Sequence, residues 1–320
     1  MRTFADLALS VALVFTLPLR AWNGTGHMVV AYMAYKNLTP KTRARVDVLI
    51  KMNPMYGAWT SGVPDADRGL VAYLNAATWP DCIKTATACP GYHPDGTDRA
   101  GENPAPGSES SQNIGYADKA MHKYWHYIDE PYATGGAHGA DPKVPNARTE
   151  IVLLVKAIST SESDTIKSYD LVWLTHLVGD VHQPLHCASR FTKNHPHGDT
   201  GGNDVVFCVK PCRDELHAYW DDLLGTKTDL KTVTRLGDAL LERGRPQGAK
   251  ETSVTAWINE SFELAKKYAY APPITDDNDL NVSVSPRPDP QYRAAARKVA
   301  QTQVRLAGYR LAALLEANLR

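Results

Sequence analysis

Residues 173–186 read Trp-Leu-Thr-His-Leu-Val-Gly-Asp-Val-His-Gln-Pro-Leu-His. The run of Leu, Val and Trp predicts a helix over Leu171–Val181. On a helix, His176 and Asp180 are four residues apart and project from one face, one turn above the other. Imidazole and carboxylate groups at this spacing are typical metal ligands, and their combination favours zinc.

Two further features strengthen this interpretation. Pro184 stops the helix, so we expect His186 to approach the same region from a different direction. A second His-x-x-x-Asp pair follows at His217 and Asp221. One such pair is most often a core histidine bonded to a nearby aspartate. Burying several titratable groups without a metal is costly, so two pairs and a further histidine favour a metal site.

Composition limits the class of protein. The chain has 320 residues, of which 43% are hydrophobic and 22% charged, and its formal net charge is zero. This length is sufficient for one large domain with a substantial core, and we expect a monomer. A neutral chain has no broad basic face for duplex nucleic acid, so any phosphate recognition must be local.

The first 21 residues resemble a secretory signal peptide. Arg2 precedes an apolar region from Leu7 to Leu19, and small Ala21 stands directly before Trp22. The apolar region is too short to span a bilayer, although Asp6 and Arg20 depart from the usual pattern. We therefore expect cleavage after residue 21, a mature domain over 22–320, a secreted or periplasmic location and no stable membrane association. The alternatives are an uncleaved anchor and a buried first helix.

The remaining pattern is mainly helical with minor β structure. Helices are expected over Leu38–Met52, Tyr73–Trp79, Thr149–Ser159 and Trp257–Tyr268, from His27 to Tyr35, around His217, and from Gln291 to the end with Val299, Val304, Leu311, Leu314 and Leu315 on its buried face. Polar segments rich in Gly and Pro predict loops over 89–118, 131–145 and 190–202. Residues 201–207 give the clearest strand signal.

Five cysteines remain after the expected cleavage. In an exported protein, their short separations make Cys82–Cys89 and Cys208–Cys212 plausible disulfides. Cys187 would then be unpaired. A buried free thiol is the favoured interpretation, and a thiolate metal ligand beside His186 is the alternative.

Taken together, the ordered residues resemble the zinc-dependent type I nucleases, which are secreted single-strand-preferring nucleases and 3′-nucleotidases related in fold to bacterial zinc phospholipase C. The resemblance covers the whole mature chain. Its most specific part is the block from His176 to His186, followed by Gly-Gly-Asn at 201–203 and the later His-x-x-x-Asp. The residues that carry it are Trp22, His27, Asp81, His126, His176, Asp180, His186, His217 and Asp221.

The resemblance implies a mainly α, single-domain phospholipase C/nuclease-type fold that holds three zinc ions. One zinc would be bound by Asp81, His126 and His176; a second by the amino group and carbonyl of Trp22 with His27; and a third by His186, His217 and Asp221. Asp180 would bridge the first two. Lys84 matches the family's basic residue facing the phosphate, and Tyr127, Asp129 and Asn203 match positions that contact the nucleotide.

The chemistry of these groups fits phosphodiester hydrolysis. The positive charge of three Zn²⁺ would exceed the negative charge of the carboxylates of Asp81, Asp180 and Asp221. A net positive charge would therefore be concentrated in one cleft of a neutral protein. Water on zinc has a pKa of about 7, so a hydroxide bridging two zinc ions would attack phosphorus. The third zinc would stabilise the departing 3′-oxygen, and the product would carry a 5′-phosphate. Single-stranded DNA, RNA and nucleotides are the expected substrates.

Two other functions compete with this interpretation. Zinc phospholipases C share most of the ligands but use Glu where this chain has Asp221. A non-catalytic zinc-binding protein of the same fold would have lost a ligand, and here none is lost. The loops over 89–118 and 190–202 are longer than usual for the family and affect the expected substrate preference. Four further histidines, His122, His182, His195 and His197, are expected beside the ligands or at the surface.

Overall fold

The computed structural model describes residues 22–84, 89, 92, 113–161, 163–207, 215–274 and 289–319. The expected signal peptide, most of the 89–118 loop, and Cys208 with Cys212 lie outside these residues. Within the described part, no helix is both long and apolar enough to cross a membrane. The chain is mainly helical with one small sheet, as the sequence predicts.

The helices of the described residues are α1 (Gly24–Asn37), α2 (Pro40–Ile50), α3 (Tyr56–Trp59), α4 (Arg68–Ala76), α5 (Trp79–Ile83), α6 (Ala147–Thr160), α7 (Asp164–Asp180), α8 (Leu216–Asp221), α9 (Leu230–Leu241), α10 (Val254–Leu264) and α11 (Pro290–Asn318). Short 3₁₀ turns include η1 (Asp65–Asp67), η3 (Gly115–Ala117), η4 (Lys123–His126), η5 (Pro184–Cys187) and η6 (Asp222–Leu224). A π-helical turn, η7 (Ala265–Ala269), follows α10 directly.

Local sequence explains where several helices begin. The Asn23 side chain accepts from the N–H groups of Thr25 and Gly26 and so caps α1. Thr39 caps α2, with Pro40 at its first position. Asn146 forms a capping box with Thr149 at the start of α6. These side chains satisfy backbone donors that a helix leaves unpaired at its N-terminus.

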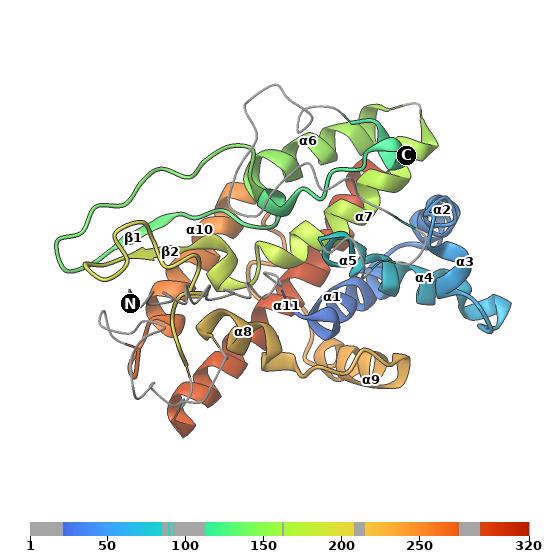
Figure 1. Ribbon diagram of the computed structural model, residues 1–320. Coiled ribbons are helices and arrows are strands. Elements are labelled where there is room, and N and C mark those ends of the chain that lie inside the picture. Colours follow the sequence, from blue (N-terminus) through green and yellow to red (C-terminus); the bar gives the residue numbers. More distant parts are fainter. Residues whose placement is uncertain are drawn as a thin grey trace, which may run out of the picture.

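The main core is built around α1 and α7. Both helices are buried along most of their length, and α1 lies against α11, α9 and α4, while α7 lies against α6 and α2. Figure 1 shows α7 in the middle of the molecule, between α6 and the α1–α11 pair. A second, smaller core joins α8 to the start of α11 through Phe207, Trp220 and Tyr292. Helices on which no face is open to water are typical of positions that must be held rigidly.

Two sequence predictions need correction. The expected helix over Tyr73–Trp79 is wrong at its end, because α4 stops at Ala76 and Trp79 and Pro80 begin the separate helix α5. Proline lacks only a donor that the first turn would leave unpaired, so it starts a helix as readily as it ends one. In α11, Leu314 is half-buried, whereas the other four predicted core positions are buried.

The position of the β structure also differs from the prediction. Residues 201–207 form a turn and a single antiparallel bridge from Val206 to Glu215. The two strands of the described residues are β1 (Pro131–Ala133) and β2 (Ser189–Phe191), which pair in parallel. β1 lies in the predicted loop 131–145, and β2 begins one residue before the predicted loop 190–202. They lie at the end of the molecule away from α2 and α3 (Figure 1). Strands of three residues are too short to give a periodic signal.

Candidate metal centre

The C-terminal half of α7 carries the central pair of side chains. The helix begins earlier than predicted, because Ser163 caps it through Ile166 N–H, and it ends at Asp180, one residue before the predicted Val181. His176 and Asp180 lie one turn apart, with 3.3 Å between His176 Nε2 and Asp180 Oδ2, and neither is exposed to solvent. The predicted one-face arrangement is therefore present.

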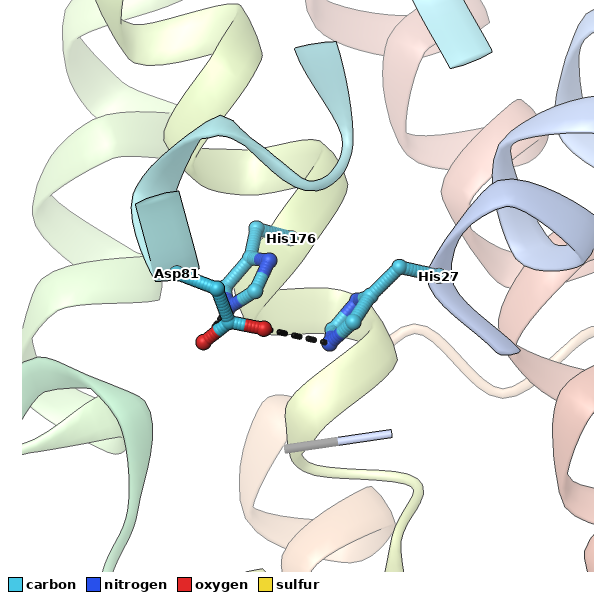
Figure 2. A group of neighbouring side chains, drawn as sticks. All are labelled: His27, Asp81 and His176. Carbon is cyan, nitrogen blue, oxygen red and sulfur yellow. Dashed lines mark ion pairs between the residues drawn. The ribbon is translucent and has the colours of Figure 1, made fainter. Parts of the chain in front are cut away.

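Three other elements bring donors to this pair. His27 comes from α1, Asp81 from α5 and His126 from the last residue of η4. Figure 2 shows Asp81 and His176 facing His27, with the two imidazoles approaching from different helices. The His27 and His176 rings stack with 3.9 Å between centroids. We call His27, Asp81, His126, His176 and Asp180 the five-residue cluster.

Asp180 lies between the histidines of this cluster. Its Oδ1 is 3.3 Å from His27 Nε2, and its Oδ2 is 3.1 Å from His126 Nδ1. Asp81 is more peripheral, with its oxygens 3.6 Å from His176 Nε2 and 3.9 Å from His27 Nε2. The two oxygens of Asp180 thus face different histidines, which is the arrangement a bridging carboxylate requires.

His186, His217 and Asp221 form a second group, which we call the three-residue cluster. His186 belongs to η5 beyond Pro184, and the other two residues lie one turn apart on α8. His217 Nε2 is 3.0 Å from His186 Nε2 and 3.7 Å from Asp221 Oδ2. The ligand atoms of these three side chains all lie within 4.8 Å of one another, a spacing that suits a metal ion. The prediction that His186 returns to the site from another direction is confirmed.

Backbone carbonyls fix the orientation of three of the histidines. Nδ1 of His176 lies 2.7 Å from Ala77 O, that of His186 lies 2.6 Å from His126 O, and that of His217 lies 2.8 Å from Gly201 O. Only a protonated Nδ1 can donate to a carbonyl, so in each neutral ring Nε2 carries the lone pair. Metal-binding histidines are usually held in this way.

The resulting pattern of lone pairs fits metal ions. His186 Nε2 and His217 Nε2 face each other at 3.0 Å, and a neutral ring held in this tautomer has no proton to place between them. Among the described residues, neither ring nitrogen of His27 has a hydrogen-bond partner within the distance and angle limits of a hydrogen bond, and neither does Asp180 Oδ1. Lone pairs that converge in a buried site are costly alone and favourable around a cation.

The two carboxylates on α7 and α8 have opposite electrostatic surroundings. Burial alone would raise the pKa of Asp180, but the charge of a protonated His176, followed by the hydrogen bond with His126, holds it well below its usual range. Burial raises the pKa of Asp221 well above its usual range, and the hydrogen bond from Gln183 offsets this only in part. Burial is also the main cause that lowers the pKa of His27 to about 4. A buried imidazole kept neutral is the form that binds metal.

The residues expected to face the substrate lie beside both clusters. Lys84 Nζ is 2.7 Å from Asp81 Oδ1. Tyr127 and Asp129 line a small pocket together with His126, His186 and His217, among others. Burial, followed by the charge of Asp199, raises the pKa of Asp129 to about 6.

Two expected contacts lie differently. Asn203 is not among the residues that line this pocket, and its amide donates to Thr200 O within the neighbouring turn. Trp22 is fully buried directly before α1, where a Cβ on Gly26 would come within 2.7 Å of Trp22 Cβ. The lack of a side chain at Gly26 therefore lets Trp22 pack against the first turn of α1.

Sequence reasoning did not identify Gln183 as part of the site. Its amide donates to Asp221 Oδ1 at 2.8 Å, and its carbonyl oxygen accepts from Leu185 N–H at 2.6 Å. The position of Gln183 between His182 and Pro184, inside the stretch that holds the predicted ligands, could have indicated that it belongs to the site. His182 is also buried, with 2.8 Å between its Nε2 and Arg310 Nη1. His122 and His195 are buried and His197 is exposed.

The cysteines agree with part of the prediction. Cys82 and Cys89 form a disulfide next to Asp81. Cys187 is a buried free thiol, and its Sγ donates to Val181 O rather than joining either cluster. The thiolate-ligand alternative therefore has no support from its position.

Comparison with known proteins agrees with this geometry. Residues 22–320 match the family model described as S1/P1 Nuclease. Endonuclease 4 of Arabidopsis thaliana is 29% identical over 178 residues, which are 48% of this chain and 54% of that protein. Endonuclease 3 of the same plant is 31% identical over 135 residues, 35% of this chain and 43% of that protein. The chain thus spans about half the length of the curated relatives it matches.

Proposed function

Because the chain belongs to the S1/P1 nuclease family, we propose that it is a zinc-dependent endonuclease. It would hydrolyse phosphodiester bonds of single-stranded DNA and RNA to 5′-phosphate products and would also act as a 3′-nucleotidase. The observation that carries this proposal is the convergence of eight buried or half-buried His and Asp side chains in two adjacent clusters. Their converging lone pairs would bind cations, and bound cations would attract the negatively charged phosphodiester.

Three zinc ions would account for the donors. Asp81, His126 and His176 would hold one, His27 and Trp22 a second, and the three-residue cluster the third. The two differently directed oxygens of Asp180 support its role as the bridge. When bound, zinc supplies Lewis-acid polarisation of the phosphoryl oxygens and activation of water near neutral pH.

The chain's own residues would position the phosphate and the leaving group. The charge of Asp81 holds the Lys84 ammonium beside the five-residue cluster, where it can pair with a phosphate oxygen. The three-residue cluster lies beyond His126, because His186 donates to His126 O. A phosphodiester between the clusters would have one ester oxygen directed toward each.

Tyr127 and Asp129 would bind the nucleoside. Both line the pocket that contains His186 and His217, so a base there would lie beside the scissile phosphate. Stacking of a base on tyrosine contributes about 1–3 kcal/mol. Tyr127→Ala should therefore raise KM by about 5–150-fold and leave zinc content unchanged. Loss of zinc instead would show that Tyr127 packs against His126 and does not bind the base.

The position of Trp22 supports a processing requirement. The chain ahead of it resembles a signal peptide, and removal of residues 1–21 would create a free amine at the start of the domain. A peptide nitrogen cannot ligate zinc in this way, because its lone pair is delocalised, whereas a free amine with a pKa of about 7.7–8.0 can. Protein beginning at Trp22 should bind more zinc than protein with one added residue. Equal zinc and equal rates would show that the amine is not a ligand.

Metal analysis and a substrate comparison test the whole proposal. Purified protein beginning at Trp22 should contain three zinc ions per chain and should cleave single-stranded DNA and RNA, with activity lost in chelator and restored by zinc. Phosphatidylcholine is the control substrate, since a phospholipase C would prefer it. Protein without zinc, or zinc-loaded protein that leaves both nucleic acids intact, would contradict the proposal.

A further inference from the structure

The orientation of His217 depends on a turn that lies between η5 and α8. Its Nδ1 donates to Gly201 O at 2.8 Å, and its backbone N–H donates to Gly202 O at 3.3 Å. The first bond directs Nε2 toward His186, whose Nε2 lies 3.0 Å away. A small displacement of the Gly201 carbonyl would therefore rotate the imidazole away from the three-residue cluster.

This turn has an unfavourable backbone conformation. Three successive residues, Thr200, Gly201 and Gly202, have φ values of 55°, 64° and 83°. Thr200 is one of only two non-glycine residues with positive φ among the described residues, and such a conformation is unfavourable for a β-branched side chain. A Cβ on Gly201 would lie 2.5 Å from Leu185 O. The turn is thus pressed against η5 and requires contacts from elsewhere to keep this shape.

The side chain of Asp199 supplies those contacts. Its Oδ1 accepts from Gly202 N–H at 3.1 Å, from Arg190 N–H at 2.8 Å and from the Tyr270 hydroxyl at 3.0 Å. Its backbone carbonyl accepts from the N–H groups of Gly202 and Asp204. One carboxylate thereby ties the turn to β2 and to the end of η7.

The surroundings of Asp199 make it a rigid support. It has no solvent exposure, and Arg190, which is also buried, places its Nε 3.5 Å from Asp199 Oδ2. The Arg190 guanidinium lies over the Tyr270 ring, 4.8 Å from its centroid. A buried carboxylate that has lost its partners is costly, so this arrangement resists rearrangement.

We propose that Asp199 is a positioning residue for the three-residue cluster, acting through Gly201 to hold His217 in its metal-binding orientation. The inference rests on the proposed metal centre. It assigns Asp199 no contact with metal or substrate. Because residues that orient metal ligands typically change metal affinity by 10–100-fold, loss of Asp199 should weaken one zinc site by about that factor and spare the others.

The test compares three variants of protein beginning at Trp22. Asp199→Ala removes all three side-chain acceptor contacts. Asp199→Asn keeps an oxygen that can accept the same bonds and should restore the site. Asp204→Ala is the matched control, because within the described part of the chain the Asp204 carboxylate accepts only from the Thr200 hydroxyl, at 2.6 Å on the exposed side of the turn. Zinc per chain and zinc affinity by chelator competition are measured for each.

We expect Asp199→Ala to retain two tightly bound zinc ions and to bind the third about 10–100-fold more weakly. Asp199→Asn and Asp204→Ala should stay close to the wild type. The rise in Tm on adding zinc should also be smaller in Asp199→Ala, whereas a purely structural role would lower Tm equally with and without zinc. If Asp199→Ala does not fold, Asp199→Ser serves for the same comparison, since its shorter side chain cannot reach Gly202 and Tyr270 together.

Three results would overturn the inference. In the first, Asp199→Ala binds all three zinc ions as the wild type does; in the second, it loses all three together; in the third, Asp204→Ala loses the same zinc ion as Asp199→Ala. Each would show that Asp199 does not act selectively on His217. A wild-type protein that binds no zinc would instead contradict the proposed metal centre, so the two failures are distinguishable.

Discussion

Asp118 and His122 are four residues apart, as are His176 and Asp180, and all four side chains are buried. In the first pair every strong polar atom has a partner of the opposite kind. Asp118 Oδ2 lies 2.5 Å from His122 Nε2 and accepts from the Tyr169 hydroxyl at 2.9 Å, while Oδ1 accepts from Ala120 N–H. The His122 ring stacks on Trp125 with 3.7 Å between centroids.

The second pair has too many acceptors for its donors. His176 Nε2 faces His126 Nδ1 at 2.8 Å as well as Asp180. Asp180 Oδ1, directed toward His27, has no hydrogen bond. Residue type, spacing and burial are therefore the same in the two pairs, and the balance of donors and acceptors separates them. A balanced pair supports the fold, whereas a surplus of converging lone pairs indicates a cation site.

The largest expected effect comes from changing the second pair. Asp180→Asn should reduce nuclease activity by at least about 10²–10³-fold, the loss seen when one preorganised electrostatic contact is removed from an active site. An amide cannot supply two anionic oxygens to two cations. Helix content should remain close to the wild type. Full activity at full zinc occupancy would contradict the bridging role of Asp180. The His176–Asp180 pair would then no longer differ in function from the Asp118–His122 pair.

A smaller effect is expected at Glu150, a buried carboxylate near His122 that forms no ion pair with any residue the structure describes. Its Oε1 accepts from the Thr149 hydroxyl at 3.1 Å, and its Oε2 has no hydrogen bond. Burial raises its pKa from 4.5 to about 7, so the folded state binds more protons than the unfolded state between these values. Stability should therefore fall as pH rises through this range and then level off.

Glu150→Gln should remove the loss of stability that ionisation of Glu150 causes. The substitution should therefore stabilise the protein by about 2–3 kcal/mol at pH 8 but little at pH 4. Urea unfolding at both pH values measures the difference. Glu263→Gln, at an exposed residue of α10 paired with Lys266, is the control and should change stability at neither pH. A gain that is the same at pH 4 and pH 8 would show that ionisation of Glu150 is not its cause.

The smallest effect is expected in the balanced pair. Asp118→Asn should destabilise the fold by about 1–2 kcal/mol, because it leaves buried donors without an anionic acceptor. Zinc content and kcat should not change. Burial alone would raise the pKa of Asp118, but its bond with His122 lowers it below the usual value. The stabilisation is therefore fully present above the unfolded pKa of about 3.9 and is lost as pH falls through the lower folded value.

The gap in stability between the wild type and Asp118→Asn should accordingly be largest at neutral pH and should narrow in acid. Thermal unfolding in chelator between pH 3 and pH 7 would show this. Loss of zinc from Asp118→Asn would mean that the first pair also supports the metal centre, and the contrast between the two pairs would disappear.

The amino-acid sequence predicted the helical class, the one-face placement of His176 and Asp180, and Cys82–Cys89 as a plausible disulfide. These features depend on residues close together in the chain, where spacing and capping chemistry fix the geometry. The pairing of His217 with Asp221 on α8 was predicted from spacing in the same way. So does the return of the chain at Pro184, since proline restricts the backbone locally.

Tertiary structure alone decided the rest. The strands β1 and β2 are three residues long and exist because distant segments meet, and α5, which begins at Trp79 and Pro80, packs against α7. Nothing in the spacing shows that Asp118 and His122 are mutually satisfied while His176 and Asp180 are not. That distinction depends on Tyr169 and Ala77, which reach the side chains of Asp118 and His176 from elsewhere in the chain. Hydrogen-bond balance in a buried site is set by the residues that pack around it.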